Sequence, residues 1–67
     1  MLKFTQTTER FIKRNLQKGN YDIDKMIDEA NKKRAMASSE DLRQEYIMIK
    51  DELSIIKNRK ISVLNFV

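Results

Sequence analysis

The chain of 67 residues contains no proline and a single glycine, Gly19. Sheets built from several strands need tight turns, which use glycine and proline for conformations that other residues avoid. Residues 9 to 60 are instead rich in glutamate, lysine, arginine, glutamine, leucine and methionine, which are good helix formers. The sequence therefore predicts an all-α fold: one small domain over residues 1–67, built as a hairpin or bundle of two or three helices.

Candidate N-caps precede three stretches of helix-forming residues. The side chains of threonine, asparagine, aspartate and serine can accept hydrogen bonds from the free backbone N–H groups in the first turn of a helix. Gly19 suits the left-handed position that follows many helices, so we expect the first helix to end there. The candidate caps are Thr5 or Thr7 for the first helix, Asn20 or Asp22 for the second, and Ser38 or Ser39 for the third.

Residues 22–60 could form one helix or two, because no residue in this range forbids a continuous helix. The apolar positions step by five from Ala37 to Leu42, which moves the apolar stripe away from a constant face. We therefore expect the chain to bend near the two serines. The predicted elements are a helix over about residues 5–18, a helix over about 22–37, a helix over about 39–60, and an apolar tail over 61–67.

The third predicted helix carries an apolar stripe with the spacing of a coiled-coil seam, in which steps of four and three residues alternate. In that register Glu45 and Glu52 occupy g positions and Lys50 and Lys57 occupy e positions, where a parallel dimer pairs opposite charges. Chance placement in so charged a helix can give the same offset. The stripe itself, our candidate set of partner-binding anchors, consists of Leu42, Tyr46, Ile49, Leu53 and Ile56.

The sequence leaves open what covers this stripe. Ile47, Met48 and Ile55 widen the apolar face beyond what a two-stranded coil buries, which favours packing against the first two helices of the same chain. Homo-oligomerisation and docking onto a different protein are the other two possibilities. A chain this short without cysteine has a small core and no disulfide, so we expect an oligomer or a partner to complete the fold.

The C-terminal segment joins a basic stretch, residues 57–60, to the mostly apolar tail at 61–67. The tail can close the bundle as a final helical turn, add a strand to a partner's sheet edge, or lie on an acidic membrane surface. It is too short to span a bilayer, which takes about 20 apolar residues. Val63 and Phe66 are its candidate partner-binding residues.

The residues of familiar catalytic sites are missing from the chain. Without histidine or cysteine, and with one glycine, there is no Ser-His-Asp triad, no cysteine nucleophile and no glycine-rich phosphate loop. Asp22, Asp24 and Asp28 lack the glycine turn and the closing glutamate of a calcium loop. We therefore expect no enzyme activity, no cofactor and no metal site.

Fourteen basic and ten acidic residues give a net charge of +4 and a pI near 9.6. Such interleaved charges mostly favour solubility, but cations that folding brings onto one face can also bind phosphate groups. The acidic start of the second predicted helix makes that helix a poor reader of the major groove. The candidate nucleic-acid-binding residues are Arg10, Lys13, Arg14, Lys32, Lys33 and Arg34.

Together these patterns favour a non-catalytic protein-interaction module, such as a regulator, inhibitor or co-chaperone, that acts through the stripe on its third helix. Its expected partner is another protein, a second copy of the chain, or both. A basic nucleic-acid-associated regulator, or a modulator of a DNA-binding protein, is the alternative. We expect a cytoplasmic location, because the chain lacks cysteine and its first residues lack the apolar core of an export signal.

Overall fold

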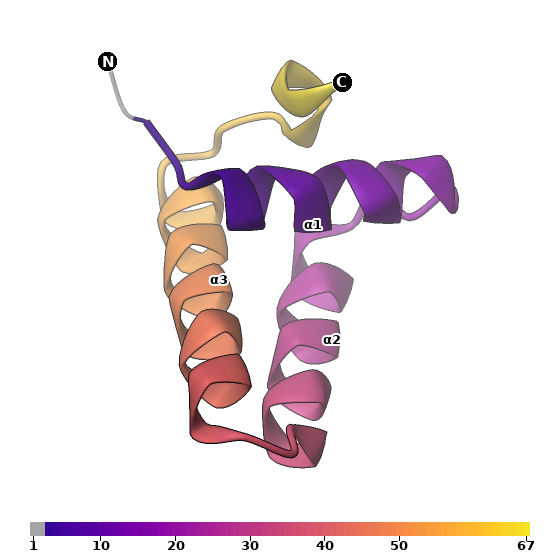
Figure 1. Cartoon of the computed structure of the whole chain (residues 1–67). Helices are drawn as coiled ribbons and strands as arrows, with labels where there is room; N and C mark the ends of the chain where they lie inside the picture. The colour runs from indigo at the N-terminus through magenta and orange to yellow at the C-terminus, as the bar shows by residue number, and fades with distance from the viewer. Residues whose placement is uncertain (1–2) are drawn as a thin grey trace.

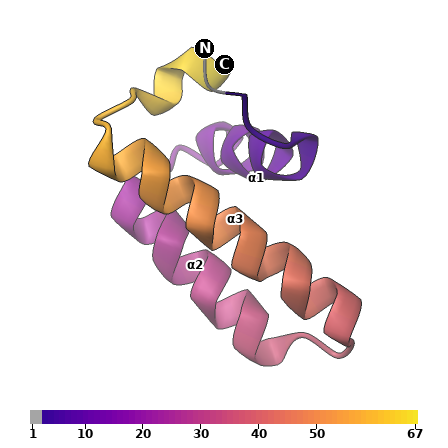
Figure 2. The ribbon, with the colours of Figure 1, turned by 90° about the vertical axis from the view of Figure 1, so that its left-hand side faces the viewer.

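The computed structural model describes residues 3–67, which form three α-helices followed by a short 3₁₀ helix (Figure 1). α1 spans Gln6–Gln17, α2 spans Ile23–Met36, α3 spans Glu40–Asn58 and η1 spans Val63–Phe66. α2 and α3 lie side by side as an antiparallel hairpin, and α1 crosses one end of that hairpin (Figures 1 and 2). The prediction of a small all-α bundle is confirmed.

Each α-helix begins at a side chain that caps its first turn. In each case the cap is one of the two candidate residues that the sequence offered for that helix. Ala37, between α2 and α3, has an extended backbone, so residues 22–60 form two helices with a break before the serines. The capping side chains belong to Thr5, Asp22 and Ser39, which accept hydrogen bonds from the backbone N–H groups of Thr8, Asp24 and Leu42 at 3.3, 2.9 and 3.2 Å.

α1 and α3 end in the same way, at a residue in the left-handed conformation. Gly19 follows α1 with a φ of +84°, and Lys60 follows α3 with a φ of +56°. Both ends have the two backbone hydrogen bonds of a Schellman motif, which turn the chain sharply at the end of the helix. These bonds run from Gly19 and Asn20 to Leu16 and Asn15, and from Lys60 and Ile61 to Lys57 and Ile56.

The hydrophobic core lies where α1 crosses the hairpin. Leu53 and Ile56 of α3 are fully buried in one cluster with Ile12 of α1 and Met26 of α2. Val63 of η1 joins the same cluster, so the C-terminal tail closes one end of the bundle. The core residues are Phe11, Ile12, Leu16, Met26, Ala30, Ile49, Leu53, Ile56 and Val63.

The centre of the apolar stripe on α3 belongs to this core, so the first two helices of the same chain cover it, which is one of the alternatives that the sequence left open. Ile49, Leu53 and Ile56 are buried within the chain, and Leu42 and Tyr46 are half-buried. The stripe is wide enough to face two neighbouring helices at once, and α1 and α2 are those neighbours. The three buried side chains therefore hold this chain together.

We predict that Leu53→Ala lowers the free energy of unfolding by about 2–5 kcal/mol, because the Leu53 side chain has no exposed surface. Ile55→Ala is the matched control, since Ile55 lies on the same helix with 39% of its surface exposed. Its loss should stay below about 1.5 kcal/mol. Urea denaturation followed by far-UV circular dichroism measures both values. Equal losses in the two variants would contradict the placement of Leu53 in the core.

Candidate functional site

The segment before α1 contacts the C-terminal tail, which lies over α1 (Figure 1). The rings of Phe4 and Phe66 have centroids 5.8 Å apart and planes inclined at 56°. Tilted arrangements of this kind are favoured by the quadrupoles of aromatic rings. The contact joins the segment before α1 to η1, and so it sets the two ends of the sequence next to each other.

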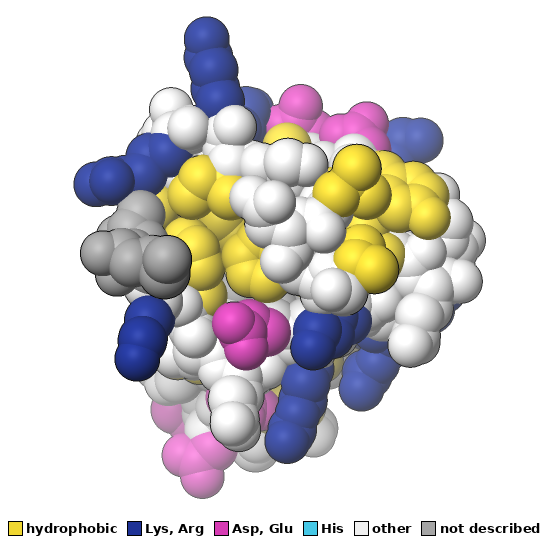
Figure 3. Space-filling model, turned by 90° about the horizontal axis from the view of Figure 1, so that it is seen from above, with side chains coloured by type: hydrophobic (Ala, Val, Ile, Leu, Met, Phe, Trp, Pro, Cys, Tyr) yellow, Lys and Arg dark blue, Asp and Glu magenta, His cyan; other side chains and the backbone are white. Residues whose placement is uncertain are grey.

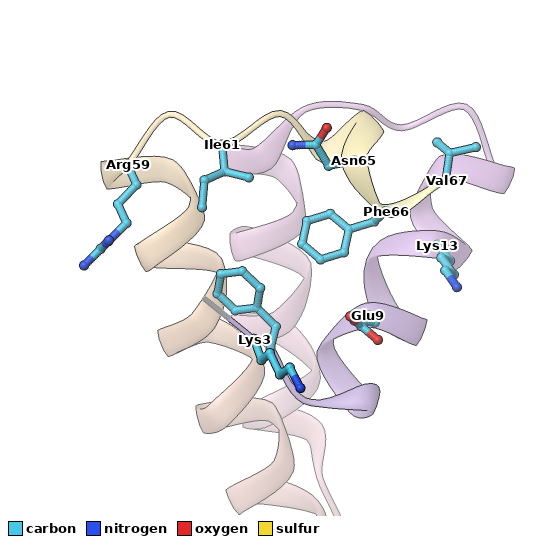
Figure 4. A pocket seen from close by; sticks show the side chains of 9 residues that line it. Lys3, Glu9, Lys13, Arg59, Ile61, Asn65, Phe66 and Val67 are labelled. Atoms are coloured by element: carbon cyan, nitrogen blue, oxygen red, sulfur yellow. The ribbon is translucent and has the colours of Figure 1, made fainter. Parts of the chain in front are cut away.

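An open hollow, which we call the tail hollow, lies between the segment before α1, α1 itself and the C-terminal tail. The Phe66 ring points toward the middle of this hollow, with Ile61 on one side of it and Val67 on the other (Figure 4). The apolar lining consists of Phe4, Ile61, Phe66 and Val67, and the polar lining consists of Lys3, Glu9, Lys13, Arg59 and Asn65.

The tail exposes large apolar side chains to water. Leu64 is 59% exposed and Val67 is 86% exposed, while Ile61 and Phe66 are half-buried against the core. Apolar side chains gather on this end of the molecule, and both basic and acidic side chains lie around them (Figure 3). Exposed apolar side chains that cluster, and are ringed by polar groups, mark a candidate contact surface.

The charges of the chain are unevenly distributed along it. Residues 3–20 and 59–67, which supply α1 and both ends, contain seven basic residues and one acidic residue, Glu9. Residues 21–58, which supply the α2–α3 hairpin, contain seven basic and nine acidic residues. The net charge of +4 therefore combines strongly basic end segments with a mildly acidic hairpin.

Glu52 of α3 binds the N-terminus of α1. Its Oε1 atom accepts a hydrogen bond from the backbone N–H of Thr5 at 2.8 Å. Its Oε2 atom accepts hydrogen bonds from the hydroxyls of Thr5 and Thr8, at 2.8 and 2.5 Å. A carboxylate at this position also interacts favourably with the positive end of the helix dipole. Because Thr5 is held in this way, the adjacent Phe4 is positioned in the lining of the tail hollow.

These hydrogen bonds change the acidity of Glu52. Partial burial by itself raises the pKa of Glu52, but the hydrogen bonds from Thr8 and Thr5 outweigh it and lower the pKa from its ordinary value of 4.5. The folded chain thus holds a proton on Glu52 less readily than the unfolded chain does. The resulting stabilisation is present above the unfolded pKa and is lost as the pH falls through the folded pKa.

We predict that Glu52→Gln lowers the free energy of unfolding at neutral pH by about 1–3 kcal/mol, because it weakens charge-assisted hydrogen bonds. The difference from wild type should shrink as the pH falls below 4.5, since wild-type Glu52 then becomes protonated. Asp51→Asn is the control, because Asp51 is an exposed neighbour on the same helix. Urea denaturation across a pH series checks the effect, and a difference that is constant with pH would contradict it.

The four charged residues that were expected to set register between two chains have different surroundings. Glu52 contacts α1 as described, and Lys57 forms an ion pair with Asp24 of α2 at 2.6 Å, which raises the pKa of Lys57. Both side chains of that pair are more than half exposed, so solvent screens it. Glu45 is exposed and Lys50 is half-buried on α3. Two of the four therefore contact other helices of their own chain.

Three of the six candidate nucleic-acid-binding residues come together in the fold. Arg10 and Arg14 of α1 and Lys33 of α2 line a second, smaller hollow, which Glu45 and Tyr46 of α3 also line. The aliphatic and aromatic parts of these side chains form the walls between the three helices. The other three candidates lie elsewhere: Lys13 lines the tail hollow, and Lys32 and Arg34 are exposed on α2.

The two tail candidates also differ from each other in the structure. Val63 is part of the core, whereas Phe66 lines the tail hollow. Lys13 was a candidate only for nucleic-acid binding, and Phe4 and Glu9 were not among the sequence candidates, because no local pattern indicates that the first and last residues of a chain meet. The apolar residues near both ends of the sequence were the one available sign.

Comparisons of the chain with protein-family models, with curated proteins and with solved structures gave no match. Over residues 3–67, none of the helices is both long enough and apolar enough to cross a membrane. The same part of the chain has no group of three or more acidic side chains arranged to hold a metal ion.

Proposed function

We propose that the protein is a small, non-catalytic protein-interaction module that binds another protein through the tail hollow. The observation that carries this proposal is the open apolar lining between the two chain ends, which is continuous with the core on one side and faces water on the other. The function expected from the sequence is retained. Its contact surface moves from the stripe on α3, whose centre is buried, to the tail.

The arrangement of the tail suits a docking surface that exists before binding. Phe66 and Ile61 are already packed against the core, so little conformational freedom is lost when a partner covers them. Leu64 and Val67 extend the apolar surface next to them. Protein interfaces commonly have a few large apolar side chains at the centre and a polar rim, which is the arrangement found here. We retain a cytoplasmic location as part of this proposal.

We predict that Val67→Asp abolishes or weakens capture of the partner by at least about tenfold, because a charge would face the buried centre of the interface. The matched control is Met36→Asp. Met36 is 82% exposed and Val67 is 86% exposed, so both changes place the same charge at a similarly exposed site. Met36 ends α2 at the far end of the hairpin (Figure 1).

In this test, each variant is immobilised and used to capture the partner. The mass of the captured complex is measured under native conditions, and circular dichroism checks the helicity of each variant. Wild type and Met36→Asp should yield the same complex, and Val67→Asp should not, with unchanged helicity in all three. A complex that survives Val67→Asp at full strength would place the contact surface elsewhere. Sedimentation of the isolated protein separates a second copy of this chain from a different protein as the partner.

A nucleic-acid-associated regulator is the second candidate function, and the uneven distribution of charge favours it. Arg10, Lys13 and Arg14 are exposed on α1, and Lys18 is exposed at its C-cap; the four extend over about 12 Å. With Lys33 beside them in the second hollow, they offer a basic surface of the kind that phosphate backbones contact. This surface adjoins the tail hollow at Lys13.

If this second function operates, the double variant Arg10→Ala/Arg14→Ala should weaken binding to duplex DNA and reduce the salt dependence of the affinity. The logarithmic slope with salt should fall by about 0.9 for each lost phosphate contact. The double variant Lys25→Ala/Lys32→Ala removes the same charge from exposed positions on α2 and should have the smaller effect. Mobility-shift titrations at about 50 and 200 mM salt give both slopes, and absence of binding at the lower salt removes this candidate.

A further inference from the structure

The lining of the tail hollow also indicates the chemistry of the partner, an inference that rests on the proposed function. Lys3, Lys13 and Arg59 lie at the edge of the apolar lining, and Glu9 is the one acidic residue that lines it. The three cations come from three different segments: the chain before α1, α1 itself, and the residue that follows α3. Folding therefore gathers positive charge around an apolar surface.

These three cations are free to interact with a ligand. The ion pairs among residues 3–67 join Lys33 to Glu29, Arg43 to Glu40 and Lys57 to Asp24, and none of them involves Lys3, Lys13 or Arg59. Glu52, the acidic residue that binds the start of α1, is held by hydrogen bonds to Thr5 and Thr8. Positive charges gathered without acidic partners favour a ligand of opposite charge.

We infer that the tail hollow binds an acidic segment of a partner protein, and that this segment carries a bulky apolar side chain. The apolar side chain packs against Phe66, Ile61 and Val67, whose burial supplies most of the affinity. Carboxylates on either side of it face Lys13 and Arg59, which speeds association and disfavours basic partners. Figure 4 shows this division, with apolar side chains around the middle of the hollow and Lys3 and Lys13 at its edge.

A protein segment fits the hollow better than a nucleic acid does. Ile61 and Val67 are aliphatic, and they offer no flat ring on which a base could stack. Phe4 and Phe66 are packed against each other at a tilt, so their faces are already partly covered. Phosphates would instead contact Arg10 and Arg14 of α1, which line the second hollow and not the tail hollow.

The test uses short fluorescent peptides and the whole protein. The first peptide alternates glutamate with leucine around one central phenylalanine. The second has glutamine in place of each glutamate, and the third has serine in place of each apolar residue. We expect the first to bind, and both others to bind at least about tenfold more weakly. Raising the salt from about 50 to 200 mM should weaken the first peptide and leave the second unchanged.

Protein variants locate the binding of the first peptide. Lys13→Ala and Arg59→Ala should each weaken it by about two- to fivefold, the effect of a partly exposed ion pair. Val67→Asp should weaken it by at least about tenfold. Lys25→Ala is the control, because it removes the same charge from an exposed position on α2 and should leave binding unchanged. All four substitutions are at exposed side chains, so the fold should persist, and circular dichroism checks that it does.

Each outcome decides for or against an acidic, apolar ligand. Equal binding of the first two peptides would show that the ligand needs no acidic side chains, which overturns this inference. The proposed function, docking of a partner protein at the tail, would then still stand. If no peptide binds but capture of the intact partner still depends on Val67, the proposed function stands and this inference fails. Displacement of the first peptide by single-stranded DNA, with the same loss on Val67→Asp, would assign the hollow to nucleic acid and overturn the inference.

Discussion

The packing of α1 across the α2–α3 hairpin is the contact on which the rest of the structure depends. Two helices alone would leave much of the wide apolar face of α3 in water, because α2 covers one side of it. α1 adds Phe11, Ile12 and Leu16 to the cluster around Leu53. Glu52 then binds the N-terminus of α1 through three hydrogen bonds, which fixes where the crossing helix begins. In so small a chain this arrangement produces both a core and a defined end surface.

The secondary structure follows from local chemistry, and this is why much of the fold could be predicted from the sequence. The helix caps, which are threonine, aspartate and serine, depend on residues close to one another in the chain. The same holds for the five-residue step between apolar positions that breaks the apolar register. Gly19 shows the same principle, since its conformation is the one expected of a glycine after a helix. Lys60 was missed. It takes the left-handed conformation without being glycine, and Ile61 and Val63 beyond it pack in or against the core.

The candidate site could not be predicted in the same way, because it depends on contacts between residues far apart in the sequence. The heptad pattern correctly marked the buried face of α3, but a pattern of apolar residues does not distinguish an intrachain neighbour from a second chain. The glutamates and lysines beside the stripe were ambiguous for the same reason, and Glu52 contacts Thr5, 47 residues away. Likewise, the positive excess of the two end segments can be counted in the sequence, but only the fold shows that these segments lie together.

The tail hollow and the core share neighbouring residues, so the proposed binding would be coupled to stability. Val63 is buried three residues before Phe66 of the lining, and Thr5, which Glu52 holds, is adjacent to Phe4. A partner that binds the hollow stabilises the arrangement that forms it, by about 2.7 kcal/mol when its concentration is 100 times its Kd. Small domains have total stabilities of the order of 5 kcal/mol, so this contribution is a large share. A short chain without disulfides can in this way be completed by its partner, even though its helices already cover the stripe on α3.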